Sequence, residues 1–165
     1  MFREMRRKKQ QLTQAECVEI LKRNTSGILA VFGDEGYPYA VPLSYVYDGN
    51  AVYFHCAKSG HKLDAIKSCA KVSFCVVDKD DVVPQKYTTH YRSVILFGRA
   101  SIVNSNEEIL SAIEKLAIKY HPMDSRENRD TAIKKDYAAM VIVKIDIEHI
   151  TGKQSIELAK SKNMQ

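Results

Sequence analysis

The sequence lacks the features that mark membrane and secreted proteins. None of its apolar runs approaches the ~20 residues that a membrane-spanning helix needs. The basic N-terminus is followed by the polar Gln11 and not by an apolar stretch, so no signal peptide is expected. The chain also lacks internal repeats and linker-like segments over its 165 residues. These absences predict one domain, residues 1–165, in the cytoplasm.

Cysteine is scarce, and its spacing excludes the common zinc frameworks. The four cysteines are Cys17, Cys56, Cys69 and Cys75, and no C-x-x-C pair occurs among them. We therefore expect reduced thiols and no metal site.

Positive charge is in excess, but it is concentrated at one end. The net charge is +5, and much of the excess comes from Arg3, Arg6, Arg7, Lys8 and Lys9. Such a run is typical of a solvated arm, here residues 1–11. No recognition-helix or aromatic RNA-platform pattern accompanies it, so no nucleic-acid partner is expected. The excess charge would instead favour an anionic cofactor.

Periodicity and turn residues predict the order of helices and strands. A capping box at Thr13 and Glu16 predicts a helix to Arg23, and a second box at Ser105 and Glu108 precedes a helix that ends at His121. A short helix is predicted at Lys62–Ser68, and the tail, residues 151–165, is expected to be partly helical. Strands are predicted at Ile28–Phe32, Tyr37–Tyr47, Ala51–Cys56, Lys71–Val77, Tyr91–Val103 and Ala138–Ile147, with a bulge or close approach at Gly98. Asp78–Gln85 is predicted to be a loop, and Met123–Asp136 a loop with some helix.

The connections between these strands indicate the fold class. Asp48-Gly49-Asn50 is a strong hairpin signal, and the neighbouring loops are also short. Strands joined by such loops must be antiparallel, because parallel crossovers need a dozen or more residues. We therefore expect a mainly β, α+β protein, an antiparallel barrel with peripheral helices and not a doubly wound parallel sheet.

The segment "YFHCAKSGHKLDAI", residues 53–66, contains two histidines, a cysteine and two lysines within a short stretch. A metal site is disfavoured because His55 and Cys56 point to opposite faces of a strand. A nucleophilic Cys56 would need a base, which His61 or Lys62 could supply, but no orienting third residue is visible. An anion site fits better, because "KSGHK" lies where a strand ends and a helix begins. An ordinary capped helix with solvated lysines is the competing interpretation.

An ordered series of motifs resembles a known family. "GYPYAVPLSYVYDGNAVYFHCAKSGHKLDAIKSCAKVSFCVV" followed by "YRSVILFGRASIV" is similar to the pyridoxamine 5′-phosphate oxidase-like flavoproteins, most of all their nitroimidazole-resistance (Nim-type) branch. The similarity covers residues 12–154. It implies a split β-barrel and a homodimer with FMN, or alternatively FAD, at the subunit interface.

The resemblance also implies site residues. Val41, Pro42, Leu43 and Ser44 match the strand that lines the flavin ring, and His55, Cys56 and Ala57 match the strand end beside it. Ser59, His61 and Lys62 match the element that holds the phosphate, with His61 in place of the usual Arg. Ser93 resembles a position that reaches the flavin from a neighbouring strand or subunit, and Lys153 a basic position near the cofactor. In the Nim-type branch, the resemblance suggests an active-site histidine at His55.

The sequence departs from pyridoxamine phosphate oxidases at several positions. Ala40 and Tyr45 stand where those enzymes have Arg and Lys, and the chain contains no Trp. Vitamin B6 oxidation is therefore not expected. The expected function is FMN-dependent reduction of a small electron-poor acceptor such as a nitroimidazole, with His55 as the catalytic residue. The alternatives are a flavin-binding or flavin-storage module and a haem-related split-barrel protein.

Overall fold

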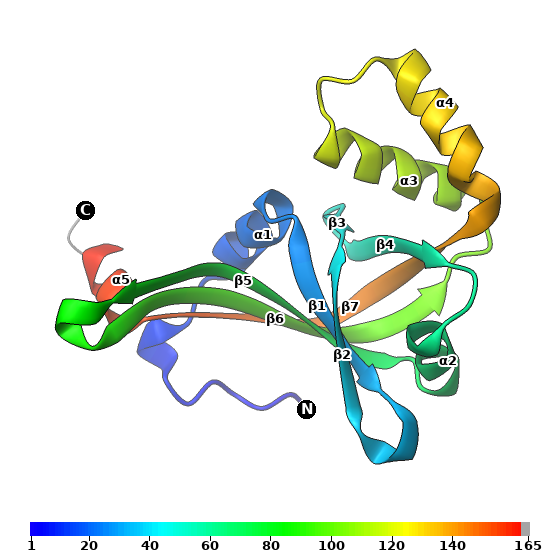
Figure 1. Cartoon of the computed structure of the whole chain (residues 1–165). Helices are drawn as coiled ribbons and strands as arrows, with labels where there is room; N and C mark the ends of the chain where they lie inside the picture. The colour runs from blue at the N-terminus through cyan, green and yellow to red at the C-terminus, as the bar shows by residue number, and fades with distance from the viewer. Residues whose placement is uncertain (163–165) are drawn as a thin grey trace.

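The computed structural model describes residues 1–162 as seven strands and a set of surrounding helices (Figure 1). The strands are β1 (Ser26–Phe32), β2 (Pro38–Ser44), β3 (Val46–Tyr47), β4 (Ala51–Ala57), β5 (Lys71–Val83), β6 (Thr88–Ile102) and β7 (Met140–Gln154). They form one sheet in the order β2-β1-β5-β6-β7-β4-β3, and every neighbouring pair is antiparallel. The predicted fold class, an antiparallel barrel with peripheral helices, is confirmed. Residues 163–165 of the predicted tail lie outside the described residues.

The helices are α1 (Gln14–Arg23), α2 (His61–Ser68), α3 (Asn106–Tyr120), α4 (Arg126–Asp136) and α5 (Ile156–Lys162). The capping box at Thr13 and Glu16 is present at the start of α1, as predicted. Helix α4 occupies the segment that was expected to be loop with some helix, and none of its residues is buried. Figure 1 shows α3 and α4 standing together beside β3 and β4.

The predicted single strand Tyr37–Tyr47 is wrong, because Tyr45 divides it into β2 and β3. These two strands are consecutive in the chain but lie at opposite edges of the sheet, so the sheet must curl to bring its edges together. Tyr45 is completely buried. Its hydroxyl donates to the Leu21 carbonyl at 2.9 Å, and its N–H donates to the Tyr120 hydroxyl at 2.9 Å. These two hydrogen bonds hold Tyr45, the residue at which the sheet closes, against α1 and α3.

The core has two parts, one on each face of β4. Val52 and Phe54 belong to the cluster inside the barrel, together with residues of α1 and α2. Ala51 and Tyr53 belong to a second cluster with α3, which covers the outer face of the strand. Because both faces are covered, four consecutive residues from Ala51 to Phe54 are buried, in place of the alternation expected for a one-sided strand.

The predicted loop Asp78–Gln85 is also wrong, because β5 continues to Val83 through an irregularity between Val77 and Lys79. The polar residues there line a two-stranded ribbon with β6, and pairing satisfies their backbone groups. Asp78 lies at the irregularity, where its carboxylate accepts hydrogen bonds from Arg23 at 2.8 Å and Asn24 at 2.8 Å. Burial alone would raise the pKa of Asp78, but these bonds lower it below its usual value.

Gly98 lies where its backbone approaches β7 closely. The register between β6 and β7 shifts between Phe97 and Gly98, so the predicted bulge is confirmed. A Cβ atom at this position would lie 2.2 Å from the Asp146 carbonyl oxygen, which only glycine avoids.

The basic arm is not solvated along its whole length. The Phe2 ring stacks on the His149 ring with a centroid separation of 4.6 Å, and on Phe97 at 5.5 Å. Gln10 is buried, and Gln11 pairs with Lys153. The arm therefore lies against the outer face of the sheet.

Among residues 1–162, no helix combines the length and the apolar character that crossing a membrane requires.

The Tyr45 hydroxyl should contribute strongly to stability. Tyr45→Phe leaves the buried Leu21 carbonyl without its partner, so we expect the free energy of unfolding to fall by about 1–3 kcal/mol. Urea unfolding measures this change. The matched control is Tyr47→Phe, whose hydroxyl bonds the exposed turn at Gly49 and should change stability by less than ~0.5 kcal/mol. Equal effects of the two variants would contradict the closing role of Tyr45.

Candidate functional site

Strand β4 places His55 and Cys56 on opposite faces, as its alternation predicts. Cys56 packs against the cluster inside the barrel. His55 is exposed on the other face, two residues beyond Tyr53, and pairs in register with Ile142 of β7. Burial raises the pKa of the Cys56 thiol, and the charge of Lys62 opposes this only in part. Cys56 is therefore a protonated neighbour of the site and not an activated nucleophile.

His55 lines a pocket of about 310 Å³, here called the helix-side pocket. Ser44 at the end of β2 lines it beside His55, so two predicted site residues meet here. The remaining lining residues are Ile113, Leu116, Ala117 and Tyr120 of α3, Ala132, Ile133 and Asp136 of α4, and Met140. The walls are mainly apolar, with one imidazole and one carboxylate. This combination suits a small, flat ligand with few polar atoms.

The start of α2 forms an open cradle, defined here as residues 58–62. Its N-cap residue is Gly60, with φ 136°, and no side chain caps the helix. In contrast, α1, α3 and α4 are capped by Thr13, Ser105 and Ser125. A Cβ atom at Gly60 would meet nothing within 4 Å, so the cradle opens outward. Uncapped N–H groups at a helix N-terminus attract anions.

The side chains around the cradle differ in whether they are free to contact a bound anion. Lys62 is half-buried beside Cys56, and the first-turn acid Asp64 pairs with Lys67 at 3.7 Å instead. The His61 ring stacks on Tyr39 at 4.2 Å, with its Nε2 3.5 Å from an Asp34 carboxylate oxygen. Lys62 can therefore turn to a bound anion, whereas the His61 ring packs against the β1–β2 hairpin.

The predicted segment of β2 lies at the edge of the sheet. Val41 and Leu43 pack against the barrel core, and Pro42 and Ser44 are exposed. Strand β2 pairs with β1 only, so its other edge has no strand partner in the described sheet. The backbone groups on that edge can bond a ligand.

Ser93 and Lys153 do not join the other site residues within one chain. They face each other across β6 and β7. Lys153 is eleven residues along β7 from Ile142, the partner of His55. Eleven residues correspond to about 36 Å of extended strand. Only a second copy of the chain would bring these side chains to the helix-side pocket.

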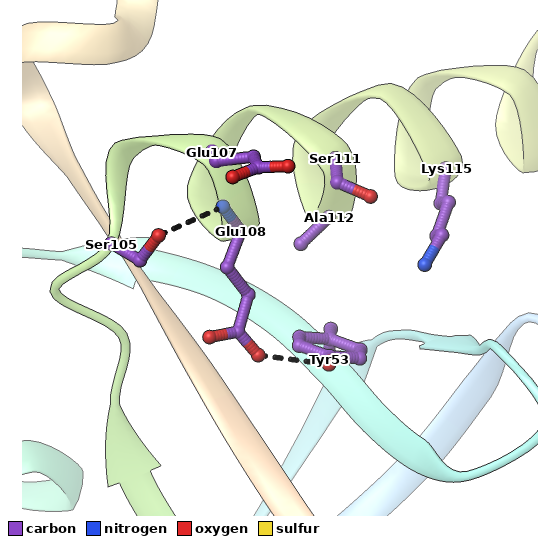
Figure 2. Close-up of a pocket in the computed structure, with 7 residues that line it drawn as sticks. All are labelled: Tyr53, Ser105, Glu107, Glu108, Ser111, Ala112 and Lys115. Carbon is purple, nitrogen blue, oxygen red and sulfur yellow. Dashed lines mark hydrogen bonds between the residues drawn. The ribbon is translucent and has the colours of Figure 1, made fainter.

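A polar cluster that sequence reasoning missed lies between α3 and β4 (Figure 2). The Tyr53 hydroxyl donates to Glu108 at 3.0 Å, and the Lys144 ammonium lies 3.4 Å from the same oxygen. Burial and this hydrogen bond raise the pKa of Tyr53 to about 12. The predicted second capping box is only half formed: Ser105 accepts from the Glu108 N–H, while the Glu108 side chain turns to Tyr53. The sequence offers one indication of this cluster: Tyr53 lies two residues before His55, so the two side chains share a face of the strand.

Within the described residues, no group of three or more His, Cys, Asp or Glu side chains is arranged to hold a metal ion.

Comparison with known proteins places this geometry in context. A family model described as pyridoxamine 5′-phosphate oxidase matches residues 13–154. Among curated proteins, none matches the sequence significantly.

Solved structures share the fold at low sequence identity. A candidate 5-nitroimidazole antibiotic resistance protein from Bacteroides thetaiotaomicron is 20% identical with a TM-score of 0.74, covering 87% of this chain and 86% of that one. A conserved protein from Mycobacterium tuberculosis is 20% identical with a TM-score of 0.77, covering 92% and 90%. An FAD- and haem-binding protein from Mycobacterium smegmatis is 20% identical with a TM-score of 0.72, covering 89% and 73%.

Proposed function

The chain belongs to the pyridoxamine 5′-phosphate oxidase family, and we propose that it is an FMN-dependent oxidoreductase that reduces a small electron-poor acceptor, such as a nitroimidazole. The observation that carries this proposal is the arrangement around the C-terminal end of β4. His55 lines the helix-side pocket, and the same strand ends directly before the uncapped N-terminus of α2. A phosphate group and a reactive ring would thus be held by neighbouring parts of one segment.

The residues present fit a flavin mononucleotide. The N–H groups of the cradle, the Ser59 hydroxyl and the Lys62 ammonium supply donors for one phosphate. The free edge of β2 at Val41–Ser44 supplies backbone groups for a polar ring edge, and Cys56 and Ala57 lie at the strand end nearby. Bound flavin would supply hydride or electron transfer, while the protein binds, orients and excludes water. A single cradle favours FMN, and FAD is the alternative flavin.

The helix-side pocket supports a neutral acceptor. Its walls are mainly aliphatic, and its one carboxylate, Asp136, disfavours anionic compounds. His55 is placed to donate a proton or a hydrogen bond to a polar group on the acceptor. Pyridoxamine phosphate oxidation is disfavoured, because Tyr45 is buried in the barrel closure and cannot replace a substrate-binding lysine.

An apolar patch on the outer face of the sheet supports a homodimer. Ile28, Cys75, Ile95 and Thr151 are successive register partners across four strands of this face. Large side chains on it are 37–63% exposed, namely Ile28, Phe32, Val77, Ile95 and Phe97. Contiguous exposed apolar area is typical of an interaction surface. Ser93 and Lys153 lie at its margin, so a second copy that packs here would bring them toward the flavin of its partner.

The four cysteines carry no disulfide, in keeping with a cytoplasmic location. Two alternative functions are compatible with the same fold. A flavin-storage module would bind the same cofactor but have little turnover, and a haem-related split barrel would bind haem in place of flavin.

Removing the phosphate cation should weaken cofactor binding. For Lys62→Ala we expect FMN affinity to fall roughly 10- to 100-fold, because a charge-assisted hydrogen bond is worth about 1.5–3 kcal/mol. Fluorescence titration with FMN, and in parallel with FAD, measures the change. Lys67→Ala on the same helix is the matched control and should bind like the wild type. Unchanged affinity of Lys62→Ala would remove Lys62 from the phosphate site.

Removing the His55 imidazole should slow the reaction but spare the cofactor. For His55→Ala we expect reoxidation of photoreduced flavin by a nitroimidazole to slow by about 100-fold or more, with near-normal FMN affinity. Anaerobic stopped-flow absorbance follows the reaction. His121→Ala, at the exposed end of α3, is the control. An equal rate in His55→Ala would exclude a catalytic role, and a wild-type flavin that reduces no acceptor would favour storage.

A charge on the apolar sheet face should separate the two copies. Ile95→Glu should convert the dimer to a monomer and abolish tight FMN binding, because each site needs both copies. Light scattering coupled to gel filtration gives the mass. Leu110→Glu is the control, since Leu110 is 50% exposed on α3 and is not one of the residues of the apolar patch. A monomer that binds FMN normally would show that one chain suffices.

A further inference from the structure

A second hollow lies on the opposite side of α3 from the helix-side pocket, and the two share no lining residue. Its volume is about 380 Å³. Three amines surround it, from Lys22 of α1 and from Lys115 and Lys119 of α3. We call it the lysine pocket.

The three amines are not equally compensated. The Lys115 ammonium lies 3.0 Å from an Asp48 carboxylate oxygen, and the Lys22 ammonium lies 3.4 Å from Glu19. The Nζ atom of Lys119 is buried, and among the described residues it has no hydrogen-bond partner. It lies over the Tyr45 ring, whose centroid is 4.1 Å away. A cation–π contact offsets only part of the cost of desolvating an ammonium group.

Burial accordingly lowers the pKa of Lys119 to about 8, so the amine is mostly protonated at neutral pH. The molecule therefore holds a positive charge that lacks an anion at the wall of a cavity. Lysine has a flexible four-carbon stem, so the amine can turn into the cavity when a partner enters.

We propose that the lysine pocket binds a small organic monocarboxylate with an apolar body, and that its carboxylate pairs with Lys119. The apolar walls, Val46 and Ile118 with the Tyr47 ring, suit a hydrocarbon or aromatic body. The Asp48 carboxylate also lines the pocket and disfavours ligands with two negative charges. The volume accommodates one ring.

The pH dependence follows from the groups that face Lys119. These are Tyr45, Tyr47, Asp48, Lys22 and Lys115. Burial raises the pKa of both tyrosines, and the pKa of Asp48 is lowered, against its burial, by N–H groups of its turn and by Lys115. None of these three titrates near pH 8. Because the carboxylate binds the protonated amine, affinity should be constant well below pH 8. It should fall up to tenfold per pH unit above the pKa of the free amine, about 8, and level off above the higher pKa of the complex.

Titration of the full-length protein with benzoate, followed by calorimetry, tests the proposal. We expect saturable binding of one benzoate per chain and no binding of benzamide, which has the same ring without the charge. Lys119→Met keeps the apolar stem and removes the amine, so it should weaken benzoate binding at least tenfold. Lys134→Met, in the last turn of α4, is the matched control and should bind like the wild type.

Folding of the Lys119→Met variant is checked by urea unfolding without benzoate, where its stability should equal or exceed that of the wild type, since an uncompensated charge has been removed. Two results would overturn the proposal: no benzoate binding to the wild type, or equal benzoate affinity in folded Lys119→Met. FMN titration of the same variants reads the flavin site separately, so failure here leaves that proposal intact.

Discussion

Tyr45 connects two strands that belong to opposite edges of one sheet, and the shape of the molecule depends on how that single residue is held. Its hydroxyl bonds the end of α1, its N–H bonds the Tyr120 hydroxyl of α3, and its ring meets Phe74 edge-on at a centroid separation of 5.0 Å. Tyr120 also donates to the Thr25 carbonyl, just before β1. The closing residue therefore fixes the sheet edges and α3 relative to one another.

Both candidate binding sites follow from the position of α3. On one side, its apolar residues and those of α4 meet His55 and Ser44. On the other side, Lys119 and Lys115 meet α1 and the β3–β4 turn. Strand β4 is covered by the barrel core on one face and by α3 on the other, and it leaves this cover at His55. His55, the proposed catalytic residue, is therefore the first exposed residue after the buried segment Ala51–Phe54 of this strand.

The sequence predicted what depends on local pattern. The helix caps, the hairpin at Asp48–Asn50 and the opposite faces of His55 and Cys56 follow from spacing alone. The break at Tyr45 was not predictable, because its neighbours continue the alternation and the cause is pairing with two distant strands. The β5 ribbon was missed because its charged residues resemble those of a loop. Asp136 and Lys119 were missed because only tertiary packing brings α3 and α4 to their pockets. The resemblance to the family indicated the cradle, but the absence of a cap on α2 became visible only in the structure.

In the proposed complex, flavin is held between two copies of the chain, with α2 of one copy at the phosphate. Native mass spectrometry of the FMN-loaded protein tests it most directly. We expect one species, in which two 18.7 kDa chains carry two FMN molecules. A single chain carrying FMN, or a dimer that carries none, would contradict it.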